Sequence, residues 1–340
     1  MADSFISPAV GGTMWAFSAL LVALSIKKLK NQNTLKSIPL MGVMGAFIFA
    51  CQMLNFSIPG TGSSGHLGGG MILAILLGPY AGFLTLSSVL IIQALFFADG
   101  GLLALGCNMF NLGFYTCFIA YPLLFRPFIN QESSKTKIAI FSIIACIVGL
   151  QLGAFSVVVE TTASGITALP FDNFLWLMQP IHLAIGVVEG LATAAVVLFV
   201  RQMEPNLVLN FSDKQEKKQA RALTFAALAA LTLLFGTVVS LFASEHPDGL
   251  EWSIEKSSIA ESQPETQLEQ SSDIHEKLAM IQSKTEIMPD YALPVADEDA
   301  EPNRYETSLA GVGGSLMVGA FIVAVCLPLK SRKKKQQPSE

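Results

Sequence analysis

Long apolar runs separated by short polar segments form the main pattern of this chain. These near-uncharged stretches, many close to the roughly 20 residues that cross a hydrocarbon core of about 30 Å, cover residues 9–26, 38–57, 67–79, 80–97, 102–125, 138–160, 174–200, 222–243 and 308–329. The pattern predicts nine transmembrane helices. Only Gly78-Pro79-Tyr80 separates the third from the fourth, so the pattern defines that boundary least sharply.

The basic residues give this pattern a direction, because short cytoplasmic loops retain Lys and Arg whereas translocated loops do not. With the N-terminus outside and the C-terminus in the cytoplasm, 17 of the 21 basic residues fall in cytoplasmic segments, namely 27–37, 126–137, 201–221 and 330–340. The other four lie in residues 244–307, which also hold 16 of the 26 acidic residues. We therefore expect residues 244–307 to form an external loop.

Composition indicates an all-α polytopic membrane protein. Hydrophobic residues make up 52% of the 340 residues and charged residues 14%, and the mean hydropathy is +0.53, which is too apolar for an ordinary soluble domain. We expect a multi-pass protein of the cell inner (plasma) membrane, with lipid and no nucleic acid as partner. Residues 1–13 contain no Lys or Arg, so no signal peptide is expected, and the five cysteines are interpreted as apolar filler.

Polarity divides the chain into two modules. Residues 1–203 are predicted to form a seven-helix block, residues 204–221 a cytoplasmic linker, and residues 222–335 a module of two helices that flank the external loop 244–307. That loop is rich in Glu, Ser, Gln and Pro and carries a strong negative charge. We therefore expect limited burial and partial disorder in the loop.

His66 is the first candidate for chemistry, since it stands in "GTGSSGHLGGG" directly before an apolar run. Glycine lets the backbone approach a bound species closely, and imidazole is the commonest protein ligand for late first-row divalent metals. A Gly-rich connector whose histidine is solvated, or caps a helix, explains the same letters. One histidine alone is a weak metal signal.

Polar groups inside the predicted spans are the second set of candidates, because a charge near the bilayer centre costs about 2.5–3.5 kcal/mol. His182 and Glu189 are seven residues apart, which places them on one face of a helix with roughly 10 Å of rise between them. Asn108 and Asn111 form an i, i+3 amide pair. These groups either support a site or bind other helices and fix the packing.

Three further residues are weaker candidates, and common nucleotide-binding and catalytic motifs are absent from the sequence. Ala19 and Ala23 form a small-xxx-small step, a weak indication of partner docking, and Asp99 is expected in an external turn. The sequence contains no GxxxxGK[ST], HExxH or GxSxG motif, so neither nucleotide hydrolysis by the P-loop route nor an enzyme of the zincin or nucleophile-elbow type is expected.

Three segments, in order over residues 4–200, resemble the CbiM/NikM family of substrate-capture permeases from cobalt/nickel energy-coupling factor (ECF) transporters. They are "SPAVGGTMW", "PGTGSSGHLGGGMILAILLGPYAGFLTLSSVLIIQALFFADGGLLALGCNMFN" and "HLAIGVVEG". The segment "HPDGLEW" at 246–252 resembles the PDGLE module, a CbiN/NikN-like component fused to such permeases. The resemblance implies a transmembrane coupling subunit (CbiQ/NikQ-like) and a cytoplasmic ABC ATPase (CbiO/NikO-like) as partners, with Ni²⁺ or Co²⁺ as cargo and no permanent cofactor.

The resemblance also implies a metal site, with His66 as the loop ligand and Met1 as the source of an amine ligand. The family's histidine at the second position is Ala2 here, so we expect the chain as written to bind the metal weakly. A Met-His start upstream of Met1 is the favoured explanation, and an altered site is the alternative. The polar groups of the spans receive no ligand role from the resemblance and are expected to support the pocket: Asn108, Asn111, His182 and Glu189.

The predicted function is ATP-driven uptake of Ni²⁺ or Co²⁺, with capture of the ion at the external loop that contains His66. Two alternatives stay open: a stand-alone secondary carrier that uses His182 and Glu189 as a proton relay, and a non-transporting membrane metal sensor. The sequence does not choose between nickel and cobalt, because both ions accept nitrogen ligands.

Overall fold

Helices form wherever the chain is apolar, because a backbone surrounded by lipid must satisfy its hydrogen bonds within its own segment. The computed structural model describes residues 1–31, 38–166, 170–207, 218–244, 246–260, 272–293 and 304–326. The N-terminal part contains η1 (Asp3–Phe5), α1 (Pro8–Asn31), α2 (Ile38–Gln52), β1 (Phe56–Ile58), β2 (Ser63–Gly65), α3 (Gly70–Leu77), α4 (Pro79–Phe96), α5 (Leu105–Met109), η3 (Phe110–Phe125), α6 (Lys135–Ser164), α7 (Phe171–Met203) and η4 (Pro205–Leu207). The C-terminal part contains α8 (Lys218–Thr237), η5 (Val239–Phe242), α9 (Gly249–Ala260), α10 (Asp273–Thr285), η6 (Pro289–Tyr291) and α11 (Arg304–Cys326).

The all-α, multi-pass class is confirmed by the helices themselves. Within the described residues, six are long and apolar enough to cross a membrane: Pro8–Lys30, Pro79–Phe96, Lys135–Ser164, Phe171–Met203, Ala222–Phe242 and Tyr305–Cys326. The apolar helix α2 is shorter, with 15 residues, and α5 continues directly into the π-helix η3. Large apolar side chains point outward, with Leu20 56% and Trp176 76% exposed, as a lipid surrounding permits.

The predicted third helix over residues 67–79 is wrong in extent. Helix α3 has only eight residues, which is about 12 Å of rise and less than half of a hydrocarbon core. An antiparallel hairpin of β1 and β2, with Ser57 opposite Ser64, precedes it, and the predicted second helix accordingly ends at Gln52 instead of residue 57. Gly69 and Gly78 flank α3 with φ values of 75° and 83°, a left-handed conformation that favours glycine.

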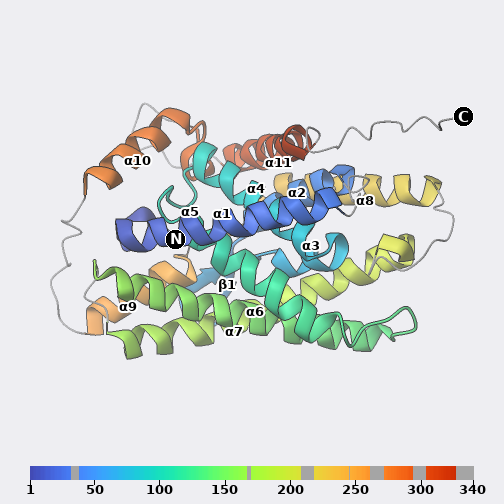
Figure 1. Cartoon of the computed structure of the whole chain (residues 1–340), viewed down its shortest axis with the longest axis horizontal. Coiled ribbons are helices and arrows are strands. Elements are labelled where there is room, and N and C mark those ends of the chain that lie inside the picture. Colours follow the sequence, from blue (N-terminus) through green and yellow to red (C-terminus); the bar gives the residue numbers. More distant parts are fainter. Residues whose placement is uncertain are drawn as a thin grey trace, which may run out of the picture.

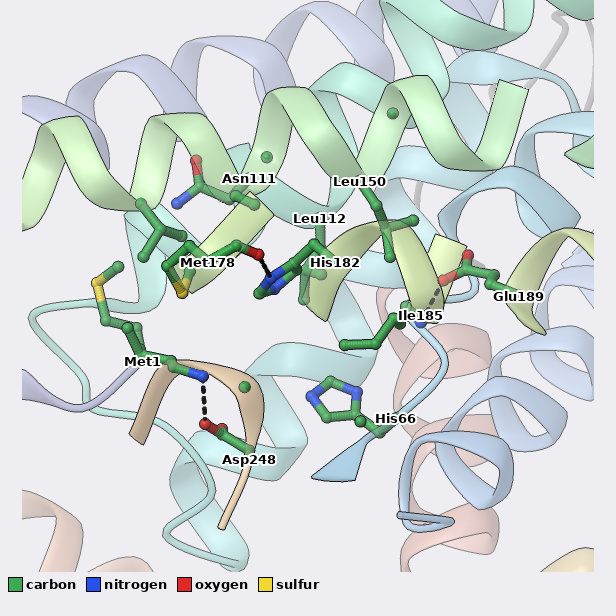
Figure 2. Close-up of a pocket in the computed structure, with 18 of the residues that line it drawn as sticks. Met1, His66, Asn111, Leu112, Leu150, Met178, His182, Ile185, Glu189 and Asp248 are labelled. Atoms are coloured by element: carbon green, nitrogen blue, oxygen red, sulfur yellow. Dashed lines mark hydrogen bonds between the residues drawn. The ribbon is translucent and has the colours of Figure 1, made fainter. Parts of the chain in front are cut away.

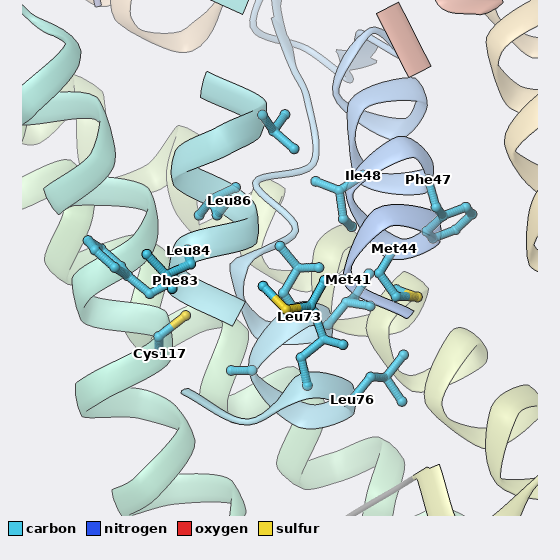
Figure 3. Close-up of a cluster of buried hydrophobic side chains, with 14 of the residues drawn as sticks. Met41, Met44, Phe47, Ile48, Leu73, Leu76, Phe83, Leu84, Leu86 and Cys117 are labelled. Atoms are coloured by element: carbon cyan, nitrogen blue, oxygen red, sulfur yellow. The ribbon is translucent and has the colours of Figure 1, made fainter. Parts of the chain in front are cut away.

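Helices α2, α3 and α4 share one apolar core. Met44, Ile48, Leu73 and Phe83 are at most 1% exposed, and Figure 3 shows the α2 side chains facing those of α3. Because α3 is short and surrounded by this core, its ends are held at fixed depth in the bundle. The chain that leads into α3 is therefore held in place as well.

Helices α6 and α7 pack against each other through glycines on α7. A Cβ added at Gly190 would lie 2.5 Å from the Cα of Ile143, and one at Gly186 would lie 2.9 Å from the Cα of Ile147. Small residues four apart let two helix backbones approach closely. Glu189, which stands next to Gly190 on α7, is 0% exposed.

The C-terminal module packs directly on the permease. Helices α8 and α11 contact each other and α2, and a Cβ at Gly311 of α11 would lie 2.2 Å from the carbonyl oxygen of Gly236 of α8. Most of the predicted linker 204–221 and the predicted cytoplasmic segment 330–340 lie outside the described residues.

The described parts of the acidic loop 244–307 contain helices that pack on the permease. Helix α9 packs on α7 and α10 packs on α4, and both lie at one end of the bundle (Figure 1). The side-chain amide of Gln282 on α10 donates to the carbonyl oxygens of Ala94 and Gly100, each at 2.9 Å. Leu250 and Met288 are buried, because these apolar side chains pack against the permease.

Candidate metal-capture pocket

A cavity of about 120 Å³ lies where the β-hairpin, η3, α6, α7 and α9 meet (Figure 2). Most of its wall is apolar, with few polar groups, the usual character of a small-ligand site. His66, Met1, Asn108, Asn111, His182 and Glu189, which the sequence singled out, all line it, and Asp248 of the C-terminal module lines it as well.

Glu189 fixes the backbone of the His66 loop. Its two carboxylate oxygens accept hydrogen bonds from the backbone N–H groups of Gly68 (2.8 Å) and Gly69 (3.0 Å), at the N-terminus of α3. An anion is stabilised there by the unpaired N–H groups and the helix dipole. Glu189 is therefore the structural counter-charge of this short helix.

Close packing holds the same loop from two other sides. The side-chain amide of Gln52 donates to the carbonyl oxygen of Gly68 at 2.9 Å. A Cβ at Gly65 would lie 2.5 Å from Cγ1 of Ile185, so the hairpin strand rests directly on α7. The glycines next to His66 thus allow the loop backbone to approach its neighbours closely. His66 itself is half-buried at the cavity.

The two imidazoles face the same space (Figure 2). The Nδ1 of His182 lies 2.9 Å from the carbonyl oxygen of Met178. A carbonyl oxygen only accepts, so Nδ1 carries the proton and, in the neutral ring, Nε2 keeps its lone pair. The Nδ1 of His66 lies 3.3 Å from the carbonyl oxygen of Leu67, a longer contact that restrains the ring less.

The N-terminal residues are tied to the connection between α4 and α5. The carbonyl oxygen of Met1 accepts from the N–H of Gly101 (3.1 Å) and from the side-chain amide of Asn108 (3.3 Å), and a carboxylate oxygen of Asp3 accepts from the N–H of Ala104 at 2.8 Å. Asn108 therefore positions Met1, whose amino nitrogen points toward Asp248 (Figure 2).

Sequence reasoning missed one buried carboxylate beside the cavity. The side-chain amide of Asn111 donates to Glu160 at 2.7 Å, and the Ser156 hydroxyl donates to the same carboxylate at 3.2 Å. Glu160 is 5% exposed. It is the last residue of the predicted span 138–160, so the rule that intramembrane charges carry function could have found it.

The other expected residues lie away from the cavity. Ala19 and Ala23 are on the exposed side of α1. Asp99 stands in the connection between α4 and α5, where it accepts a hydrogen bond from the hydroxyl of Tyr291. The five cysteines are buried free thiols.

Nitrogen and oxygen atoms available to a cation converge here from separate parts of the chain. They belong to the imidazoles of His66 and His182, the amine of Met1 and the carboxylate of Asp248. Among the described residues, no three His, Cys, Asp or Glu side chains lie close enough together to hold a metal ion. A bound cation would therefore need main-chain or amine nitrogens, or water, in addition to side chains.

Apolar membrane helices around a small cavity with imidazole, amide and carboxylate groups define a membrane protein with a candidate binding site for a small polar solute. The chain belongs to the family described as cobalt uptake substrate-specific transmembrane region, CbiM, whose model matches residues 1–207. Residues 222–331 match the PDGLE domain, so both resemblances found in the sequence are confirmed.

Similar proteins carry related names. A putative metal transport protein of Haloquadratum walsbyi is 38% identical over 206 residues, covering 61% of this chain and 91% of that protein. A putative fused nickel transport protein NikMN of Archaeoglobus fulgidus is 31% identical over 319 residues, covering 94% of this chain and 95% of that protein. A putative fused cobalt transport protein CbiMQ of Methanocorpusculum labreanum is 27% identical and covers 62% of this chain and 36% of that protein.

A solved structure, described as a truncated transition metal transporter, has the same fold. It aligns with a TM-score of 0.53 and 28% sequence identity, covering 59% of this chain and 98% of that chain. Together with the family match, these relatives place the chain among membrane metal transport proteins.

Proposed function

We propose that this chain is the substrate-binding component of an ATP-driven ECF uptake system for Ni²⁺ or Co²⁺, and that it captures the ion from outside at His66. The supporting observation is the half-buried imidazole of His66 at a cavity, on a loop held by Glu189. Met1 is the second proposed ligand, through its amine. The names of the relatives support nickel or cobalt as cargo.

The proposed orientation places the N-terminus and the cavity outside the membrane. The basic end of α1, the connection from η3 to α6 and the end of α7 with Arg201 lie at the right of Figure 1, opposite α9 and α10. Basic segments mark the cytoplasmic side. The acidic α9 and α10 region then lies outside, where its negative charge attracts cations from solution.

Partner subunits complete the proposed system. The sequence contains no P-loop motif, so a separate ATPase supplies the energy, and fusion to a Q component in the CbiMQ relative supports a coupling subunit. Ala19 and Ala23 lie on the exposed face of α1, where small side chains allow a partner helix to approach closely. We propose this face of α1 as the docking site of the coupling subunit.

The alternative of a stand-alone carrier with a His182–Glu189 proton relay finds no support in the geometry. Both oxygens of Glu189 already accept backbone hydrogen bonds, and Nδ1 of His182 is bound to Met178. Neither contact leads a proton from one residue to the other.

Uptake of radioactive nickel or cobalt tests the proposal. Cells that co-express the chain with a coupling subunit and an ATPase should accumulate the metal, and His66→Ala should abolish accumulation. His246→Ala is the matched control, because His246 is exposed and does not line the cavity. Uptake that persists in His66→Ala, or that needs no partner subunit, would contradict the proposal.

A further inference from the structure

The PDGLE segment extends the sheet of the His66 loop. The N–H of Ser64 donates to the carbonyl oxygen of Pro247 at 2.8 Å, and the Ser64 hydroxyl donates to the carbonyl oxygen of His246 at 2.8 Å. Two residues earlier in the module, the N–H of Ser244 donates to the carbonyl oxygen of Asn55 at 2.7 Å. Ser244 and residues 246–248 are thus fixed to the hairpin that carries His66.

This attachment brings Asp248 to the cavity with its two oxygens in different roles. Oδ1 accepts from the N–H groups of Leu250 and Glu251, both at 2.8 Å, and so caps the N-terminus of α9. The cap does not use Oδ2. The carboxylate is turned toward the amino nitrogen of Met1 (Figure 2).

The turn that carries Asp248 is pressed against α7. A Cβ at Gly249 would lie 2.7 Å from Cγ2 of Ile181 and 3.4 Å from Cε1 of His182. Only glycine fits at that contact without displacing its neighbours. The position of the Asp248 carboxylate relative to His182 is therefore set by packing as well as by hydrogen bonds.

We propose that Asp248 is a cation-binding residue of the pocket, with Oδ2 as an anionic oxygen ligand for the divalent ion that His66 binds. This inference rests on the proposed function, because it adds a ligand to the same cavity. A divalent ion in a mostly apolar cavity needs negative charge nearby. Of the two carboxylates that line the cavity, Glu189 has both oxygens engaged by main-chain N–H groups. In Asp248 the cap engages Oδ1, and the carboxylate also faces the amino nitrogen of Met1 (Figure 2), which is itself a proposed ligand.

The chemistry of the donor set fits a first-row transition ion. Imidazole nitrogen and carboxylate oxygen both bind such ions, and Nε2 of His182 adds a second nitrogen with a lone pair directed away from Met178. The cavity of about 120 Å³ has room for an ion with some of its water, because one water needs about 10–15 Å³ of such space. The C-terminal module then contributes to the site itself.

Titration of the purified full-length chain with NiCl₂ and with CoCl₂ tests this role. Asparagine caps a helix as well as aspartate does, so Asp248→Asn keeps the cap and removes the charge. We expect Ni²⁺ affinity to fall at least tenfold, thermal unfolding to stay unchanged, and the visible spectrum of bound Co²⁺ to change because an oxygen ligand is lost. Glu255→Gln is the control, since it removes the same charge from α9 at a side chain that is 56% exposed.

Equal Ni²⁺ affinity and an unchanged Co²⁺ spectrum in Asp248→Asn would overturn the proposal, and so would an equal loss in Glu255→Gln. If Asp248→Asn lowers the unfolding temperature, Asp248→Ser, which also caps, replaces it in the same comparison. His66→Ala separates the two ideas. Loss of binding in His66→Ala with no effect of Asp248→Asn removes only the role of Asp248, whereas unchanged binding in His66→Ala refutes the proposed function.

Discussion

The two hydrogen bonds from Gly68 and Gly69 to Glu189 make a strong prediction for Glu189→Gln. A hydrogen bond to a charged group is worth about 1.5–3 kcal/mol, and a buried N–H left without a partner costs about 1–3 kcal/mol. Glutamine keeps one acceptor oxygen but turns an NH₂ group toward the other N–H. Because glutamine is uncharged, the variant no longer bears the cost of a buried carboxylate, and this offsets part of the loss. We therefore expect the start of α3 to be destabilised by about 2 kcal/mol.

Hydrogen–deuterium exchange in detergent measures this change directly. Since 1.4 kcal/mol is a factor of ten, a loss of about 2 kcal/mol raises local opening of the region around residues 66–72 about 30-fold. Glu132→Gln is the control, because Glu132 is exposed in the connection before α6 and such substitutions stay within about 0.5 kcal/mol. If the protection of residues 66–72 were the same in Glu189→Gln and in the wild type, Glu189 would not hold the loop.

Two further predictions concern packing and pH. Gly190→Ala should lower the free energy of unfolding by about 1–3 kcal/mol, because the new Cβ meets the backbone of Ile143 at 2.5 Å. Gly12→Ala is the control: a Cβ there has nothing within 4 Å, so the unfolding temperature should stay the same or rise slightly. Equal losses of stability in both variants would count against the packing argument. Burial and the nearby Asp99 raise the pKa of Asp290. An acid whose pKa is raised by folding makes the protein more stable as pH falls through that pKa. The stability advantage of Asp290→Asn over the wild type at pH 7 should therefore shrink in thermal melts as the pH is lowered toward about 4, the ordinary pKa of an aspartate. An advantage independent of pH would refute this.

Several features could be predicted from the sequence because they depend on local composition. The long spans follow from the transfer of apolar side chains out of water, and each of the nine predicted ranges contains helix in the structure. His66 stood out through its glycine neighbours, and the family motifs pointed to the same loop. Glu189 stood out because a carboxylate within a span is costly unless it has partners.

The tertiary structure alone decided the length of α3 and the partners of the polar groups. Hydropathy adds up side-chain transfer energies, so it does not distinguish a short helix preceded by a glycine loop from a complete span. Glu189 and Gly68 are 121 positions apart, and Ser64 is 182 positions from His246. Such contacts depend on the direction of individual hydrogen bonds and on the close approach of backbones, and both arise only when the helices have packed. The place of Asp248 at the cavity follows from these long-range contacts.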